Sequence, residues 1–484
     1  MLLVSIMATS WLLAASHSVV RPLFQVSDEL SYVLTVQAKA LELSPADRAC
    51  ILPPEGQAFD FPPRGGKFGF HNASALVLAG ACRIGAGPLA IPLTRVALAI
   101  TLPAIVGLTW WLGWLVAPHS RFVAPAAALS TATQPVIATF SGGMAPDGLA
   151  NAASAGSLLV ATHLVLNRPG GQWVLPMLLC AVAAIAAKDS ALFLGPLTLL
   201  VVGAWSVQTS VRRAALTTAL VGLGALVLAS SGLLSMLSTP YPNLDTVLTW
   251  AIAEPTAFAT IVVNSYVTHA GKVLHSALAG LANFGGGSLD LPWSLYLLQV
   301  AVLTVGIAAF VAACTAEAGM GTRLRRFAAL VLAALLLDAV QIPVRQLMTD
   351  SLGPIQGRWL FPVWPLVIVA CVIGWDTLLR RRAPAVLPLF SVGSALIAVA
   401  ALVRIVGYYY RDWPQVFAWP NLFLYAAEGQ NAGVDVARTM ATATMVPVTL
   451  QAAVLVAATL SLLVVFVTSS GVARSAMAQG SSND

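Results

Sequence analysis

Long runs of apolar residues recur along the whole chain and are separated by short polar connections. Each run holds about twenty residues, enough for an α-helix to cross roughly 30 Å of hydrocarbon. The pattern therefore predicts an all-α fold, a polytopic bundle of about 11–13 transmembrane helices. The expected spans are 2–23, 90–117, 122–141, 149–166, 172–187, 190–208, 214–237, 294–315, 327–345, 359–378, 385–407 and 446–469.

Long polar segments interrupt this series, and we expect them on one side of the membrane. They divide the chain into an N-terminal transmembrane module, 1–237, and a C-terminal module, 238–484. Long connections are usually functional, and we expect these to carry interfacial helices. The outer segments are the first outer loop, 24–89, followed by 238–293, 346–358 and 408–445.

Three stretches fit the pattern less well. Residues 73–91 are apolar but broken by Arg83 and by glycines, so we expect a re-entrant or interfacial segment. Residues 247–283 are weakly amphipathic, which favours helices lying on the membrane surface. Residues 1–24 resemble a cleaved signal peptide in hydrophobicity, but they lack a basic N-terminal region, so we favour a first transmembrane helix.

The composition excludes a soluble domain. Hydrophobic residues make up 58% of the chain and charged residues only 9%, with a mean hydropathy of +0.85, whereas soluble domains carry roughly 25% charged residues. The net charge of +6 does not indicate nucleic acid, because the arginines lie in short clusters between apolar runs. No P-loop or GxGxxG motif occurs, which argues against a nucleotide cofactor. The five cysteines lack metal-binding spacing, so we expect small core residues.

The arginines predict how the chain is threaded. If the N-terminus is cytoplasmic, every short inner connection carries arginine, as the positive-inside rule requires. These residues are Arg121, Arg168, Arg212, Arg213, Arg323, Arg325, Arg326, Arg380, Arg381, Arg382 and Arg474. Most acidic residues fall on the opposite side, partly because the outer segments are longer. We therefore expect any chemistry at the extracytoplasmic face.

The first motif that could carry chemistry is Ser27-Asp28-Glu29, a few residues beyond the first span. It places two adjacent carboxylates at the lipid–water boundary. A partly desolvated carboxylate there can serve as a general base. The alternative is that these residues only begin a surface helix.

The second motif is Ala145-Pro146-Asp147-Gly148, in a short outer turn between two spans. Pro-Asp-Gly is ordinary turn chemistry, and Asp147 could simply cap the following helix. Asn151, one turn into that helix, is placed to brace the same loop.

The third motif is Gln356-Gly357-Arg358-Trp359, just before an expected span on the outer side. An arginine there breaks the positive-inside pattern, so a partner must compensate for its charge. A lipid phosphate would suit the guanidinium group; otherwise, the arginine snorkels to the headgroups. Arg345 could contribute to the same positive site.

Two weaker candidates and several aromatic residues remain. Lys188 and Asp189 lie at the outer end of two spans and could form a simple ion pair, and Asp338 lies within an expected span. The tryptophans and tyrosines fit interfacial belts. They are Trp110, Trp111, Trp114, Trp359, Trp364, Tyr408, Tyr409 and Tyr410.

The three motifs, in this order, resemble a large family of bacterial polytopic membrane proteins of unknown function in the GT-C glycosyltransferase superfamily. The resemblance covers roughly residues 1–410, and the Gln-Gly-Arg element is its most distinctive part. Three positions depart from the family pattern: Ser27 replaces proline, Ala145 replaces asparagine and Trp359 replaces tyrosine.

The resemblance implies a GT-C-like enzyme of the bacterial cytoplasmic membrane that transfers a sugar from a polyprenyl-phosphate donor to an acceptor of the cell envelope. Asp28 or Glu29 would be the base, and Arg358, with Arg345, would bind the departing phosphate. Asp147 would orient a substrate or hold a divalent cation, Mg²⁺ or Mn²⁺. The alternatives are a transporter or flippase of lipid-linked glycans and a non-catalytic membrane protein.

Overall fold

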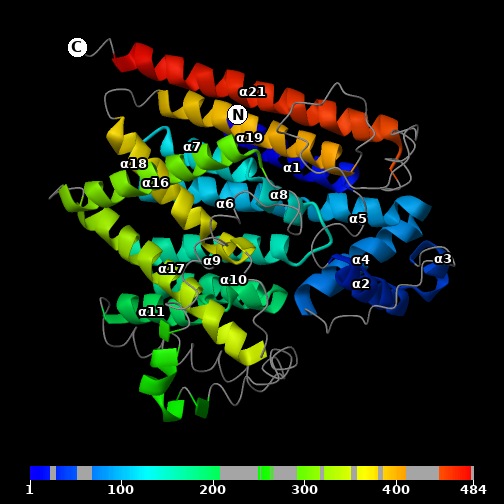
Figure 1. Ribbon diagram of the computed structural model, residues 1–484, viewed down its shortest axis with the longest axis horizontal. Coiled ribbons are helices and arrows are strands. Elements are labelled where there is room, and N and C mark those ends of the chain that lie inside the picture. Colours follow the sequence, from blue (N-terminus) through cyan, green and yellow to red (C-terminus); the bar gives the residue numbers. More distant parts are fainter. Residues whose placement is uncertain are drawn as a thin grey trace.

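The computed structural model contains only helices in the part of the chain that it describes (Figure 1). That part comprises residues 1–21, 29–51, 68–207, 249–250, 252–261, 263–264, 291–316, 321–349, 357–379, 385–409 and 446–480. The all-α fold is confirmed, and the described helices indicate a multi-pass membrane protein. Seven of them are long and apolar enough to span a membrane: Leu2–Val20, Gly87–Val116, Asp147–Asn167, Trp293–Thr315, Leu360–Leu378, Val386–Val406 and Thr449–Ser475.

The long helices lie beside one another in a single bundle (Figure 1). They are α1 (Leu2–Val20), α5 (Ala90–Leu98), α6 (Thr101–Val116), α7 (Val123–Ala132), α9 (Asp147–Asn167), α10 (Val174–Ala187), α11 (Leu194–Val207), α16 (Trp293–Ala316), α17 (Gly321–Thr349), α18 (Trp364–Leu378), α19 (Val386–Tyr409) and α21 (Val448–Gly480). Helix α1 packs against α6 and α21, and α9 packs against α6 and α10. The buried core therefore runs through α1, α6 and α9.

Most of the expected spans coincide with one helix, but two are interrupted. The expected span 90–117 is divided into α5 and α6 by a turn at Ala99 and Ile100. The stretch 73–91 is covered by α4 (Phe68–Arg83) and by the turn that leads into α5. The expected span 214–237 lies outside the described residues, as does most of 247–283.

The second interruption divides the expected span 122–141 into α7 and the short helix α8 (Pro135–Ser141). A proline disfavours the helical conformation of the residue before it, and Gln134 is extended, with φ −69° and ψ 113°. Pro135 then occupies the first turn of α8, where its missing N–H is not needed. The break therefore follows from the sequence Gln-Pro within an apolar run.

Helices α16 and α18 cross in close contact at Gly306 and Gly374. The indole Nε1 of Trp375 donates a 2.9 Å hydrogen bond to the carbonyl oxygen of Val302. A Cβ added to Gly374 would lie 2.7 Å from the backbone nitrogen of Phe310 and closer still to the carbonyl oxygen of Gly306. Backbone atoms cannot move aside as a flexible side chain can, so this crossing requires glycine.

We expect Gly374→Ala to destabilise the folded protein by about 1–3 kcal/mol, the usual cost of overpacking. The measurement is thermal unfolding of the purified protein in detergent. Gly393→Ala is the matched control, because a Cβ at Gly393 in α19 would meet nothing within 4 Å. Equal stability of the two variants would contradict the observed crossing.

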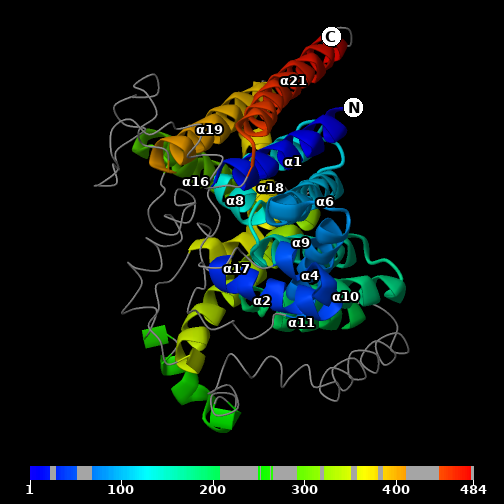
Figure 2. The ribbon, with the colours of Figure 1, turned by 90° about the vertical axis from the view of Figure 1, so that its right-hand side faces the viewer.

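A small helical module stands at one end of the bundle, on the right of Figure 1. It consists of α2 (Glu29–Leu43), the single turn α3 (Arg48–Ile51) and α4. Tyr32 of α2 packs against Phe70 and His71 of α4, with ring centroids 6.2 and 5.8 Å apart. Helix α4 in turn packs against α5 and α10, so the module is fixed to the bundle (Figure 2).

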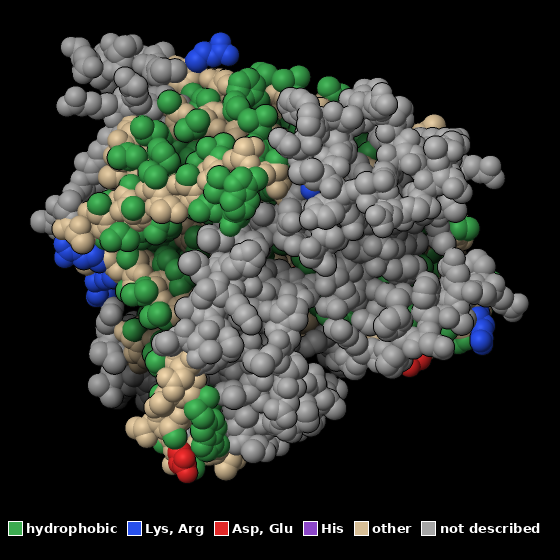
Figure 3. Space-filling model, viewed as in Figure 1, with side chains coloured by type: hydrophobic (Ala, Val, Ile, Leu, Met, Phe, Trp, Pro, Cys, Tyr) green, Lys and Arg blue, Asp and Glu red, His purple; other side chains and the backbone are tan. Residues whose placement is uncertain are grey.

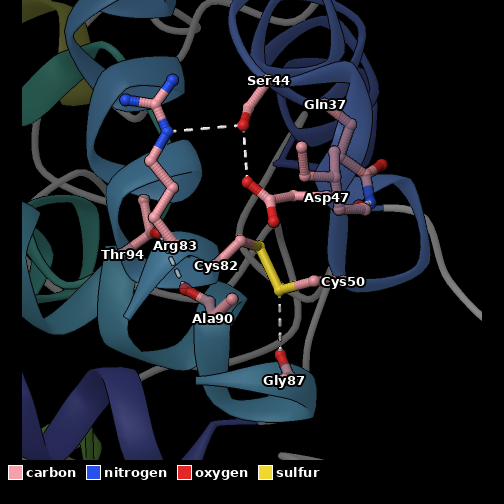
Figure 4. The surroundings of a disulfide bond; sticks show 10 residues. Gln37, Ser44, Asp47, Cys50, Cys82, Arg83, Gly87, Ala90 and Thr94 are labelled. Carbon is pink, nitrogen blue, oxygen red and sulfur yellow. Dashed lines mark hydrogen bonds between the residues drawn. A yellow bond between two sulfur atoms is a disulfide. The ribbon is translucent and has the colours of Figure 1, made fainter. Parts of the chain in front are cut away.

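A disulfide bond between Cys50 and Cys82 closes this module (Figure 4). Beside it, Ser44 donates a hydrogen bond to Asp47 at 2.5 Å, and the Nη2 of Arg83 donates one to the carbonyl oxygen of Leu43 at 3.1 Å. The expectation that all the cysteines are small core residues is wrong for this pair. Their sequence separation of 32 residues gave no recognisable spacing, and only the packing of α2 on α4 brings them together.

At the opposite end of the bundle, one arginine joins two helices by hydrogen bonds. Arg323 of α17 donates hydrogen bonds to the carbonyl oxygen of Leu115 at 2.6 Å and to the Oδ1 of Asn167 at 3.1 Å. It thereby joins the last turns of α6 and α9. Figure 3 shows apolar side chains over the left-hand part of the visible face, with Lys and Arg at its left-hand edge and also at the top and at the right-hand edge of the molecule. Arg323 thus joins two helices at one end of the bundle, and the disulfide lies at the other.

Candidate functional site

The candidate site centres on a buried ion pair between Asp147 and Lys188. Asp147 is the first residue of α9, and Lys188 follows the last residue of α10. The Nζ of Lys188 donates to the Oδ1 of Asp147, and each residue is 4% exposed. A carboxylate in the first turn of a helix also interacts favourably with the helix dipole. The sequence alone suggested a pairing of Lys188 with Asp189. The structure shows Asp147 as a partner of Lys188, and the side chain of Asp189 lies outside the described part.

Close backbone contacts hold the start of α9 in place. A Cβ at Gly148 would lie 2.6 Å from the Oγ1 of Thr101 and 3.1 Å from the Cα of Ser141. Only glycine therefore allows α9 to start against α8 and the first residue of α6. Asn151, one turn further, is also buried at 6% exposure.

The last turn of α1 anchors α8 and the loop that follows it. Ser18 donates a 2.7 Å hydrogen bond to the carbonyl oxygen of Gly142, and the Nδ1 of His17 lies 2.9 Å from the Oγ1 of Thr139. Arg95 of α5 donates a 3.1 Å hydrogen bond to the carbonyl oxygen of Arg21. These contacts connect the first span to the short turn that carries Asp147.

The third sequence motif lies against the same site. The single-turn helix η4 (Asp189–Ala191) follows Lys188, and the 3-10 helix η5 (Gly357–Val363) begins at the glycine of the Gln-Gly-Arg motif. Helix η5 packs against both α9 and η4. The structure thus brings the Pro-Asp-Gly turn, Lys188 and the backbone of the third motif together, although about 170–210 residues separate them in sequence.

Several expected site residues are placed only in part. Asp28 and Gln356 lie outside the described residues. Glu29 begins α2, Asp189 begins η4, Arg345 lies in α17 and Arg358 lies in η5; their side chains lie outside the described part. The convergence of Asp28 with Arg358 therefore stays a prediction.

Asp147 was also considered as a ligand of a divalent cation. Lys188 already supplies a positive charge to its carboxylate. Among the described residues, no group of three or more His, Cys, Asp or Glu side chains is arranged to hold a metal ion. Carboxylate and carbonyl oxygens are the usual ligands of Mg²⁺ and Mn²⁺, and a cation at Asp147 stays a prediction.

Sequence analysis missed the polar residues that the bundle buries beside this site. His17 and Arg95 are 3% and 0% exposed, and Gln134 precedes the break in the expected span 122–141. A signal was present in each case, because a charged or amide side chain within an apolar run is costly to insert. The apolar runs around these residues were long enough to be interpreted as uninterrupted spans.

No protein-family model matches the chain, and a search of curated proteins finds no match.

Proposed function

We propose that this chain is a membrane glycosyltransferase that transfers a sugar from a polyprenyl-phosphate donor to an acceptor outside the cytoplasm. The observation that carries the proposal is the packing of η5 against α9 and η4. It places the segment containing Arg358 beside the buried pair of Asp147 and Lys188. Two of the three motifs that resemble the GT-C superfamily therefore occupy one site.

The chemistry of the site favours an anionic lipid substrate. Lys188 holds its charge in a buried position, where an ammonium group needs an anionic partner, and Asp147 supplies it. Arg358 adds a guanidinium group to the neighbouring segment. Asp147 neutralises the charge of Lys188, so the positive charge that would bind a lipid phosphate comes from Arg358. Its planar guanidinium group can donate two parallel hydrogen bonds to two phosphate oxygens.

The two ends of the bundle support an extracytoplasmic site. Disulfides form and persist in oxidising compartments such as the bacterial periplasm. The Cys50–Cys82 disulfide lies in the first outer loop, in the module that packs against α5 and α10. Arg323 lies at the other end, as the positive-inside rule requires. We infer that α2, α4 and the Asp147–Lys188 pair face the outside.

In the proposed reaction, the bond between the sugar anomeric carbon and the phosphate oxygen breaks, and the anomeric carbon forms a bond to an acceptor oxygen. The acceptor proton moves to the carboxylate of Asp28 or Glu29. The polyprenyl phosphate leaves with the bonding electron pair, and Arg358 stabilises the developing negative charge. The Asp147–Lys188 pair holds α9 and η4 in the geometry that positions η5.

Release of polyprenyl phosphate tests this proposal without requiring the sugar acceptor to be known in advance. The full chain is reconstituted with a panel of polyprenyl-phosphate-linked sugars and an extract of envelope lipids and glycans. We expect release with at least one donor, reduced about 10–100-fold in Arg358→Lys because an ammonium cannot replace a guanidinium fork. Release that is equal in the wild type and in Arg358→Lys would contradict the assignment.

A further inference from the structure

A buried amide pair lies inside the bundle at the break between α7 and α8. The Nε2 of Gln299 in α16 donates a 2.8 Å hydrogen bond to the Oε1 of Gln134. Gln134 is 1% exposed. Within the described part of the chain, the Nε2 of Gln134 and the Oε1 of Gln299 are both buried without a hydrogen-bond partner.

This arrangement presents one donor and one acceptor at the same place. If both amides were turned over, their roles would exchange, and one donor and one acceptor would still remain. Buried polar groups without partners are rare in folded proteins, and they commonly mark a bound molecule or a functional site. The amide pair therefore points to a ligand.

A third buried polar atom lies on the neighbouring helix α18. Trp364, the first residue of α18, is 6% exposed, and its Nε1 is buried without a hydrogen-bond partner among the described residues. The sequence suggested an interfacial belt residue, and this is wrong for Trp364. An indole N–H can only donate, so its missing partner is an acceptor oxygen.

The contacts between α16 and α18 show how far Trp364 lies from Gln299 along the helix axes. Val302 lies beside Cys371, and Phe310 lies beside Gly374, so the two helices run in the same direction. Gln299 precedes Val302 by three residues, and Trp364 precedes Cys371 by seven. At 1.5 Å per residue, Trp364 lies about 6 Å, one helical turn, from the level of Gln299.

The chemistry of the three atoms selects the ligand. A hydroxyl group can donate to the Oε1 of Gln299 and accept from the Nε2 of Gln134 at once. An ionised phosphate only accepts, so it would leave the Gln299 oxygen facing a negative charge. A cation would face two N–H donors. Two or more neighbouring hydroxyl groups satisfy all three atoms.

We propose that Gln134, Gln299 and Trp364 form a carbohydrate subsite that binds hydroxyl groups of the lipid-linked sugar. The inference rests on the proposed function. Trp364 directly follows η5, which carries Arg358 and packs against α9. The subsite is therefore continuous with the candidate site, and it positions the sugar while Arg358 binds the phosphate.

The test uses the full chain in lipid nanodiscs and three octyl glycosides as probes: the β-glucoside, the β-galactoside and the β-mannoside. The control amphiphile is octyldimethylamine oxide, which has the same chain length and no hydroxyl group. Each glycoside is added at a concentration of roughly ten times its own dissociation constant. We expect at least one of them to raise the unfolding temperature by about 2 °C more than the amine oxide does.

Two conservative variants separate binding from folding. Trp364→Phe removes the N–H without a partner together with one ring of the buried indole, so it should lower the unfolding temperature modestly and abolish the glycoside-specific rise. Trp375→Phe removes an N–H that is bonded to Val302, so it should lower the unfolding temperature and keep the glycoside-specific rise. Gln134→Leu should behave like Trp364→Phe in the response to glycosides.

The subsite is overturned if no glycoside stabilises the wild type more than the amine oxide, or if Trp364→Phe retains the full rise. No glycoside effect in the wild type would mean that the three atoms bind only water. The glycoside test and the test of the proposed function can fail independently. A glycoside-specific rise without release of polyprenyl phosphate would overturn the reaction and keep the subsite.

Discussion

Replacement of Lys188 with methionine should destabilise the folded protein by about 3–5 kcal/mol, the usual cost of removing one partner of a buried ion pair. The methionine fills a similar volume, so little of the loss comes from a cavity. The loss comes from Asp147, whose carboxylate would stay buried without the ammonium group of Lys188. The measurement is reversible unfolding in mixed detergent micelles.

The double variant Asp147→Asn with Lys188→Met tests whether the lost stability comes from an unpaired buried charge. It removes both charges, so it should recover most of the stability that the single variant loses. Lys39→Met, on the partly exposed α2, controls for the loss of a lysine. If Lys188→Met is as stable as Lys39→Met, the buried pair does not hold α9 and η4 together.

Loss of the general base should have the second large effect. We expect Asp28→Asn or Glu29→Gln to reduce release of polyprenyl phosphate about 10²–10⁴-fold, because an amide cannot take the acceptor proton. The variant that loses activity should still bind the donor lipid, since Arg358 is intact. Glu42→Gln, an exposed residue of α2, should have normal activity. Normal release by both carboxylate variants would eliminate the assignment of the base.

The apolar periodicity was sufficient to predict the helical class and most spans, because about twenty apolar residues in a row have few other stable states. It missed the turn at Ala99–Ile100, which lies within one membrane-length stretch, and the break at Gln134–Pro135. A hydropathy average over a span is little affected by a turn of two residues. The Gln-Pro pair contained the local signal, since proline disfavours helix at the residue before it.

The candidate site was less predictable than the fold. Asp147 and Lys188 could each be proposed from their position at a helix end, but their pairing depends on how α9 packs against α10. The disulfide depends in the same way on the packing of α2 against α4. Contacts between segments that are distant in sequence depend on the tertiary structure, so they could not be predicted from this one sequence.

Binding of the released lipid tests the central claim most directly, because every donor of the proposed class yields the same polyprenyl phosphate. The full chain in nanodiscs is titrated with a long-chain polyprenyl phosphate, and bound lipid is counted by native mass spectrometry. We expect saturable binding that weakens about 10-fold or more in Arg358→Lys and is unchanged in Arg474→Lys near the C-terminus. Equal binding by the wild type and Arg358→Lys, or stronger binding of the unphosphorylated polyprenol, would contradict a phosphate site at Arg358.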